Sequence, residues 1–266
     1  MFRRIVRRQA RLRLAAVALA VPLVVTVGAV RVDAQSPDEN SESAPTSASY
    51  TGPVSSANAR FIVEGYQTLL GRQADTSGLD FHLARLAAGG ATSRQAFTYS
   101  LLFSVEGSRG EVTRAYDDLL DRAPDTEGHA YWTDHLQGRS VLDLRVLLLS
   151  SDEYHNGAGG NDQAWIEALY DDVLDRGADP SGLSYWLERA GAGVPRALIA
   201  ASIYQSDEAL AQRAVAHYQE VLSRSPSTAE RSAAVDTIRQ AGERVLRAQL
   251  LASDEAYEDY LQAALS

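Results

Sequence analysis

The sequence predicts an all-α protein built from four tandem repeats, and three observations support this. Four tyrosines open related motifs that stand 50, 54 and 48 residues apart. Apolar residues within the repeats recur with helical spacing, and the chain beyond residue 34 has no run of alternating apolar and polar residues that would indicate a strand. Because one such repeat is too small to bury its own apolar face, we expect the repeats to pack on one another.

The repeat motif has five recurring positions. A Tyr-x-x-Leu/Val-Leu-x-Arg segment is followed three residues later by Asp-x-x-Gly, and two repeats then carry a Tyr-Trp pair. The residues at these positions are Tyr66, Arg72, Asp75, Gly78, Tyr116, Arg122, Asp125, Gly128, Trp132, Tyr170, Arg176, Asp179, Gly182, Trp186, Tyr218 and Arg224. The fourth repeat has Ser227 and Glu230 where the Asp and Gly stand elsewhere. Four matching segments at near-constant offsets indicate true internal repetition.

The first helix of the repeat is best defined in the third copy. Its apolar residues fall at i, i+3, i+4, i+7 and i+8, on one helical stripe: Ile166, Leu169, Tyr170, Val173 and Leu174. Gly177 is predicted to be a left-handed C-cap. Asp179 before Pro180 is typical of an N-cap followed by proline at the first helical position.

A second, short helix follows the turn, and a third follows a glycine-containing loop. Gly182 lies in the first turn of the second helix, where close packing of the preceding helix could exclude a side chain. Gly191 and Gly193 are predicted to end this helix, and the third begins near Pro195. Each repeat ends in a Ser-x-Glu segment, 29 to 32 residues after its arginine, which predicts the capped start of a further helix: Ser104–Glu106, Ser151–Glu153, Ser206–Glu208 and Ser253–Glu255.

These patterns divide the chain into six segments. We predict a signal peptide over 1–34, a disordered linker over 35–57, and repeats over 58–110, 111–160, 161–209 and 210–266, the last as a degenerate cap. The Gly-rich stretch 156–161 is interpreted as a flexible joint between the second and third repeats.

The N-terminal segment has the order of an export signal. Arginines between Arg3 and Arg13 precede an apolar stretch from Leu14 to Val30, and small residues lead to Ala34. A secreted or cell-envelope location follows, with an uncleaved membrane anchor as the alternative because the apolar run approaches the length of a spanning helix. The Ser-, Pro- and Thr-rich sequence after it contains too few large apolar residues to fold.

The net charge of the chain beyond residue 34 limits the classes of partner that we expect. Of 25 basic residues seven lie in residues 1–34, as does one of the 35 acids, which leaves 18 against 34 and a net charge of −16. A surface this acidic argues against nucleic acid and against anionic membranes, so the expected partner is a protein or an envelope glycan. The chain has no cysteine, which removes disulfides and thiol chemistry.

The motifs also resemble a known family. The segments around Leu174-Asp175-Arg176, Asp179-Pro180-Ser181-Gly182-Leu183 and Tyr185-Trp186 are similar to the bacterial domain of unknown function numbered 4214. The first repeat departs from the pattern with Phe81-His82 in place of Tyr-Trp. The resemblance implies an exported helical module of cell-surface or secreted bacterial proteins, and it carries no catalytic residues to transfer.

The sequence predicts no catalytic or cofactor-binding residue. The turn aspartates are interpreted as helix caps, with calcium binding as the alternative, although a complete calcium loop is absent. The recurring arginines are interpreted as bonding to helix-end carbonyls or to an acid, with a ligand-binding ladder as the alternative. The aromatic pairs are expected to be core anchors, although their tyrosines could stack on sugars. A non-catalytic scaffold is the favoured function, with a calcium-dependent surface-layer or adhesion component, or a glycan hydrolase using Glu127 and Asp134, as alternatives.

Overall fold

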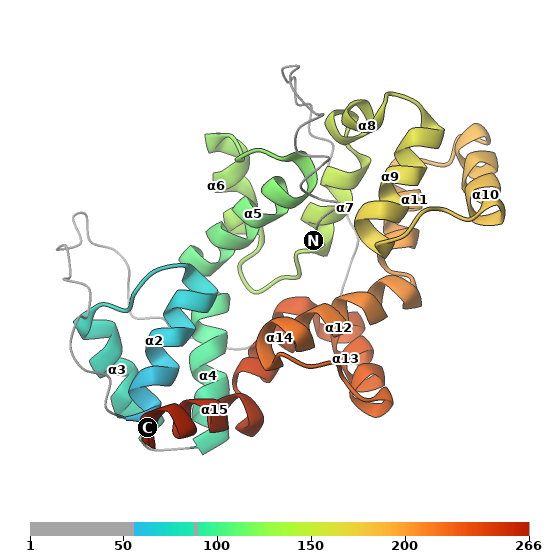
Figure 1. Ribbon diagram of the computed structural model, residues 1–266. Coiled ribbons are helices and arrows are strands. Elements are labelled where there is room, and N and C mark those ends of the chain that lie inside the picture. Colours follow the sequence, from blue (N-terminus) through green and yellow to red (C-terminus); the bar gives the residue numbers. More distant parts are fainter. Residues whose placement is uncertain (1–55, 88–89, 266) are drawn as a thin grey trace. The chain divides into compact units, whose positions relative to one another are not determined.

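The computed structural model describes residues 56–87 and 90–265 (Figure 1). These residues form helices and contain no strand, which confirms the all-α prediction. They divide into two compact units, and each is treated by itself. Unit 1 comprises 112–129 and 142–209, and unit 2 comprises the remaining described residues, 56–111, 130–141 and 210–265. The predicted signal over 1–34 and the linker up to residue 55 lie outside the described residues.

The helices follow the predicted repeat order of a long helix, a short helix and a third helix. The first two repeats contain α2 (Ala57–Leu70), α3 (Thr76–Leu86), α4 (Gly90–Leu102), α5 (Val105–Leu120), α6 (Thr126–His135) and α7 (Leu142–Ser150). The last two contain α8 (Asp152–Ala158), α9 (Asp162–Leu174), α10 (Pro180–Gly191), α11 (Arg196–Tyr204), α12 (Asp207–Leu222), α13 (Thr228–Ala241), α14 (Glu243–Leu251) and α15 (Asp254–Leu265). The predicted linker ends two residues early, because Ser56 caps α2 and Ala57 is its first residue.

The serine of each Ser-x-Glu segment is the N-cap of the next helix. Its hydroxyl oxygen accepts a hydrogen bond from the backbone N–H three residues later in all four repeats, as in Ser151 with Tyr154 and Ser253 with Ala256. After the first and third repeats this helix continues without a break through the motif tyrosine of the following repeat, as α5 and α12, and it ends two residues before the motif arginine. The segment therefore joins one repeat to the next, as well as closing its own.

The C-cap of the repeat's first helix is not where the sequence suggested. Gly177 does not adopt a left-handed conformation, and the prediction that it is the C-cap is wrong. Asp175, two residues earlier, has φ 48° and caps α9. Gly71, Asp121 and Ser223 hold the corresponding place with φ between 53° and 70°. Aspartate tolerates this region better than most residues, so the position did not require glycine in every copy.

The repeats pair through their third helices within each unit. In unit 1, α7 of the second repeat packs against α11 of the third (Figure 1). In unit 2, α4 of the first repeat packs against α14 of the fourth, and α15 packs against α2. Ala248 and Leu251 of α14 belong to the apolar core formed by α2, α3 and α4. The fourth repeat therefore completes the core of the first and is not an end cap of an open array.

The two pairings use equivalent residues. Arg94 of the first repeat forms an ion pair with Asp254, and Arg196 occupies the same repeat position in the third and pairs with Asp152. Tyr257 is four residues after its capping serine, and it donates a hydrogen bond of 2.5 Å to Asn58.

His155 and Asp162 stand at the positions equivalent to Tyr257 and Asn58. Nε2 of His155 lies 3.6 Å from Oδ1 of Asp162. The rings beside these pairs also correspond, Tyr257 with Phe61 at 5.8 Å and His155 with Trp165 at 6.4 Å. The fourth repeat thus meets the first as the second meets the third.

The Gly-rich stretch 156–161 lies between α8 and α9. The motif tyrosine Tyr170 stands 19 positions after the capping serine Ser151, against 12 positions in the other joined repeats. Gly159 and Gly160 have positive φ, their N–H groups donate to carbonyls of α8, and Asn161 caps α9. Because of the extra residues, this stretch forms two helices, α8 and α9, whereas α5 and α12 are each one continuous helix.

Candidate functional site

The recurring arginines all face a glutamate of the Ser-x-Glu segment. Nε and Nη2 of each guanidinium donate in parallel to the two carboxylate oxygens, at 2.5–2.6 Å and 2.7–2.9 Å. The four pairs are Arg72–Glu106, Arg122–Glu153, Arg176–Glu208 and Arg224–Glu255. A fork-to-fork pair is geometrically selective, which explains why both residue types recur together.

Each arginine is also held by its own helix end. Its guanidinium carbon lies 5.0–5.4 Å from the ring centroid of the motif tyrosine six residues earlier. Its Nη1 donates to the carbonyl of the next residue at 2.9–3.2 Å. We call this arrangement of tyrosine, arginine and glutamate the Tyr–Arg–Glu clamp. It occurs once per repeat and joins the end of one helix to the start of another.

The turn aspartate and glycine fit against the same tyrosine. The carboxylate oxygen of Asp179 accepts the N–H of Gly182 at 2.9 Å, and Asp75 and Asp125 do the same at 2.8 Å. A Cβ on Gly182 would lie 2.5 Å from the Tyr170 hydroxyl oxygen. The glycine therefore recurs because the tyrosine hydroxyl packs against its α-carbon, as the expected close packing of the two helices implied.

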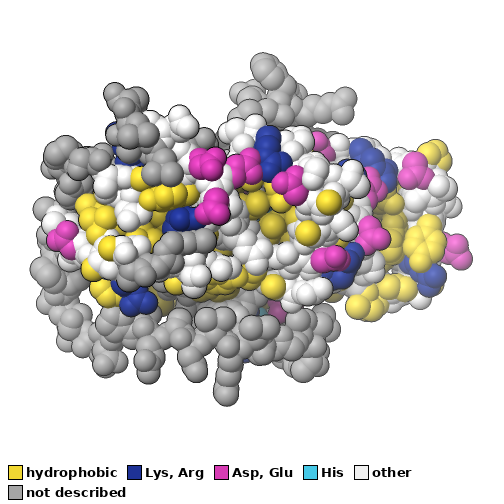
Figure 2. All heavy atoms as spheres, turned by 90° about the horizontal axis from the view of Figure 1, so that it is seen from below, with side chains coloured by type: hydrophobic (Ala, Val, Ile, Leu, Met, Phe, Trp, Pro, Cys, Tyr) yellow, Lys and Arg dark blue, Asp and Glu magenta, His cyan; other side chains and the backbone are white. Residues whose placement is uncertain are grey.

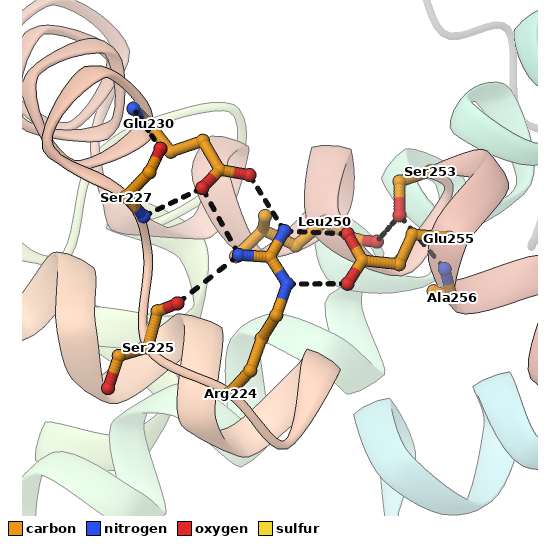
Figure 3. Close-up of polar contacts among 8 residues, drawn as sticks. All are labelled: Arg224, Ser225, Ser227, Glu230, Leu250, Ser253, Glu255 and Ala256. Carbon is orange, nitrogen blue, oxygen red and sulfur yellow. Dashed lines mark hydrogen bonds and ion pairs between the residues drawn. The ribbon is translucent and has the colours of Figure 1, made fainter.

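The fourth repeat keeps the clamp with different residues (Figure 3). Ser227 replaces the turn aspartate and accepts the N–H of Glu230, which occupies the glycine position. The Glu230 carboxylate accepts from Nη1 and Nη2 of Arg224 at 3.1 and 2.7 Å, so this arginine contacts two carboxylates. The fourth repeat departs from the motif in sequence, yet it keeps the Tyr–Arg–Glu clamp and adds a second carboxylate to it.

The electrostatics of the clamp match its geometry. The hydrogen bonds that Arg72 donates to Glu106 raise the pKa of Arg72, and those that Arg176 donates to Glu208 lower the pKa of Glu208. The hydroxyl of Ser181 and the N–H of Gly182 lower the pKa of Asp179 to about 2. All these groups are charged near neutral pH and already have a partner of opposite charge or a donor. The arginine and the glutamate of each clamp are therefore paired with each other.

A double-mutant cycle on one clamp measures its contribution. We expect Arg122→Gln and Glu153→Gln each to destabilise the protein, with a coupling energy of about 1 kcal/mol, because the pair is bidentate but about one-third exposed. Urea denaturation of the four proteins at low and high salt gives this energy, which should shrink at high salt. Additive effects of the two changes would contradict the clamp.

The second helix of each repeat carries the aromatic pair. Trp132 is buried, whereas Trp186 is only half-buried and donates through Nε1 to the Tyr170 hydroxyl at 3.2 Å. Tyr131 and Tyr185 are exposed. The first repeat has His82 at the tryptophan position, buried beside the rings of Tyr66 and Phe97.

His82 makes the stability of the first repeat sensitive to acid. Burial, followed by the nearby charge of Arg85, lowers the pKa of His82 from 6.5 to about 4. Between these values the unfolded chain takes up a proton that the folded chain refuses, so stability falls as the pH drops. We expect a loss of up to about 3 kcal/mol from this residue between pH 6.5 and 4. Denaturation of His82→Phe over the same range should show a correspondingly flatter profile, and an unchanged slope would contradict this assignment.

Unit 2 contains three buried arginines that the repeat pattern did not reveal. Arg94, Arg244 and Arg247 are each at most 7% exposed. Arg247 lies 2.7 Å from Glu220 and 3.5 Å from Glu111, and Arg94 bonds to Asp254 and the Ala252 carbonyl. Arg244 and Arg247 occupy no recurring motif position, and Arg94 shares its place only with Arg196 of the third repeat, outside the motif. Arg244 and Arg247 stand among apolar residues of the short helix α14, whereas Arg94 stands between Ser93 and Gln95 on α4.

Other candidate groups lie apart from this arrangement. Glu127 and Asp134, considered above as a carboxylate pair, are both exposed. Within the described part of the chain, no group of three or more His, Asp or Glu side chains has a metal-binding arrangement. No helix among the described residues is long and apolar enough to span a membrane.

These features define a class of protein, an all-helical repeat protein in which every repeat is closed by a Tyr–Arg–Glu clamp. A family model described as a domain of unknown function, DUF4214, matches residues 42–110 and 146–213, just over half of the chain. The chain therefore belongs to the DUF4214 family. No curated protein and no solved structure gave a significant match.

Proposed function

We propose that this protein is a non-catalytic interaction or scaffold module of the secreted or cell-envelope proteome. One observation carries the proposal. The residues that recur in every repeat are engaged with one another in the clamp, as in Arg176 with Glu208 and Tyr170, so they build the repeat. Selectivity for a partner would then reside in side chains that differ between repeats, on a scaffold held rigid by the clamps.

The location and partner class rest on the sequence. The basic and apolar order of residues 1–34 supports export, and the excess of acids over arginines beyond it supports a protein or glycan partner in preference to nucleic acid or anionic lipid. On the face drawn in Figure 2, arginine and acidic side chains of the described residues lie beside one another among apolar ones.

Capture from envelope fractions tests the proposal. Residues 35–266 serve as bait at low and at moderate salt, and the same bait carrying Arg122→Gln, Arg176→Gln and Arg224→Gln serves as a control for the integrity of the clamps. We expect a defined partner that the intact bait retains at both salt concentrations and the control retains less well. If no partner is retained at any salt concentration, the proposal fails.

Two measurements separate the alternatives. A calcium-dependent surface-layer or adhesion component would show a higher midpoint of thermal unfolding in calcium than in chelator, because a ligand that binds only the folded state must raise it. A glycan hydrolase would degrade peptidoglycan or polysaccharide, and a Glu127→Gln variant would lose that activity. The exposure of Glu127 and Asp134 favours the non-catalytic proposal, since an acid catalyst needs a desolvated cleft.

A further inference from the structure

Three exposed aromatic rings occupy one repeat position on the second helix. Phe81 on α3, Tyr131 on α6 and Tyr185 on α10 are 49%, 60% and 47% exposed. They are half of the six large hydrophobic side chains that are strongly exposed among the described residues. The fourth repeat has Ala233 at this position, so the feature is absent where the repeat pairs its clamp differently.

Each of the three rings packs against side chains of its own helix. The ring of the following residue meets it edge-on, at 5.1 Å for Phe81 with His82, 5.2 Å for Tyr131 and 4.8 Å for Tyr185. A basic side chain four residues later lies near each ring as well. An exposed ring held in this way loses little conformational entropy when a ligand stacks on it.

The basic side chains beside two of these rings are arginines. The guanidinium carbons of Arg85 and Arg189 lie 5.3 and 5.0 Å from the ring centroids of Phe81 and Tyr185. Both arginines are exposed, and neither forms an ion pair with a carboxylate in the described part of the chain. They differ in this from the clamp arginines, which are all paired. In the second repeat His135 takes the place of the arginine, with its ring stacked 6.0 Å from Tyr131.

Two of these rings have a carboxylate, which can accept hydrogen bonds, nearby on the same helix. Asp134 and Glu188 stand three residues after Tyr131 and Tyr185, on the same side of the helix as the ring. Both carboxylates are exposed. On α10 an exposed ring, a guanidinium and a carboxylate therefore stand together, and the other two positions share part of this arrangement.

We propose that these ring positions bind a neutral glycan, one sugar face stacking on each exposed ring. Sugar hydroxyls can both donate and accept hydrogen bonds, so they match a guanidinium beside a carboxylate. An anionic glycan or an acidic peptide fits less well, because the chain carries a formal net charge of −10 and places acids beside two of the three rings. A polymer that repeats the same sugar presents many copies of the ligand to each of these positions. This inference rests on the proposed scaffold function and names its partner.

Affinity electrophoresis of the full mature chain tests the assignment. The gels contain dextran, β-1,3-glucan or glucomannan as neutral polymers, and alginate or polyglutamate as acidic ones. The variants are the three single changes Phe81→Ala, Tyr131→Ala and Tyr185→Ala, and their combination, none of which alters net charge. The matched control is Leu147→Ala with Leu198→Ala, which removes two other exposed apolar side chains. Circular dichroism checks that each variant remains helical.

We expect at least one neutral polymer to retard the protein. Each single ring change should lower the apparent affinity by about threefold to tenfold, the combination should abolish retardation, and the leucine control should behave as the parent. Failure of all three neutral polymers would overturn the inference, as would retardation that survives the combined change or that occurs only with alginate or polyglutamate. Capture of an envelope protein partner despite such a failure would leave the scaffold function standing.

Discussion

Replacing Arg244 with methionine is expected to destabilise the protein by about 3–5 kcal/mol, among the largest single effects in unit 2. Arg244 is 3% exposed at the start of α14. Its guanidinium donates to the carbonyl of Leu102 at the end of α4 and to that of Leu136 just after α6, the latter at 3.1 Å. Leu102 is the last residue of α4, so its carbonyl has no partner within that helix and the arginine supplies one. The Leu136 carbonyl also accepts the N–H of Arg139 at 3.2 Å.

The loss of stability comes from the acceptor groups that Arg244→Met leaves without this donor. Methionine fills much of the same volume, yet it donates no hydrogen bond, so several buried carbonyl oxygens lose a donor. Arg244 also donates to the Arg139 carbonyl and the Ser108 hydroxyl, each at 3.3 Å, and lies 4.3 Å from the Phe103 ring centroid.

Equilibrium urea unfolding measures the loss for Arg244→Met. Arg239→Met on α13 is the control, because Arg239 is about half exposed and pairs with Asp236 on its own helix. We expect the control to change stability by less than about 0.5 kcal/mol. Equal effects of the two substitutions would show that Arg244 does not hold the helix ends together.

Local features of this fold could be predicted from the sequence because they depend on neighbouring residues. The helix stripe around Tyr170 and the caps at Asp179 and Ser151 involve contacts within a few positions. The helix order and the all-α class followed from these. The C-cap was misplaced at Gly177 because the left-handed position is filled by aspartate in that repeat, and sequence reasoning favours glycine there.

Long-range features could not be predicted in the same way. The Arg–Glu pairs join residues 31 to 34 positions apart, and the sequence showed that both recur without showing that they touch. The packing of the fourth repeat on the first depends on contacts such as Arg94 with Asp254, 160 positions apart. A linear array and this paired arrangement have the same repeat pattern, so the pattern alone does not choose between them.

The candidate glycan positions show the same limit. The sequence offered the tyrosines beside Trp132 and Trp186 as possible stacking groups, and it noted Phe81 only as a departure from the pattern. The structure groups Phe81 with Tyr131 and Tyr185 because all three are exposed at one repeat position. Exposure is a property of packing that residue spacing does not reveal, and so is the absence of an ion pair at Arg85 and Arg189 among the described residues.

The second large effect is expected at Gly107, where alanine should destabilise the protein by about 3 kcal/mol or more. Gly107 lies in the first turn of α5, where its N–H donates to the hydroxyl oxygen of Ser104. A Cβ there would lie 2.2 Å from the Leu101 carbonyl oxygen and 2.7 Å from that of Leu102. Both obstacles are backbone atoms, and the Leu102 carbonyl is also an acceptor for Arg244, so relief of the clash would disturb that contact as well.

Gly110 is the matched control, because it lies in the same helix and nothing stands within 4 Å of where its Cβ would be. Alanine there should stabilise the protein by about 0.5–1 kcal/mol, the ordinary gain from replacing a helical glycine. Urea unfolding of Gly107→Ala and Gly110→Ala should thus give changes of opposite sign from the same substitution three residues apart. If Gly107→Ala is as stable as the parent, then α4 and α5 do not approach as closely at this corner as the structure places them, and the bond from Arg244 to Leu102 would have to be reconsidered with it.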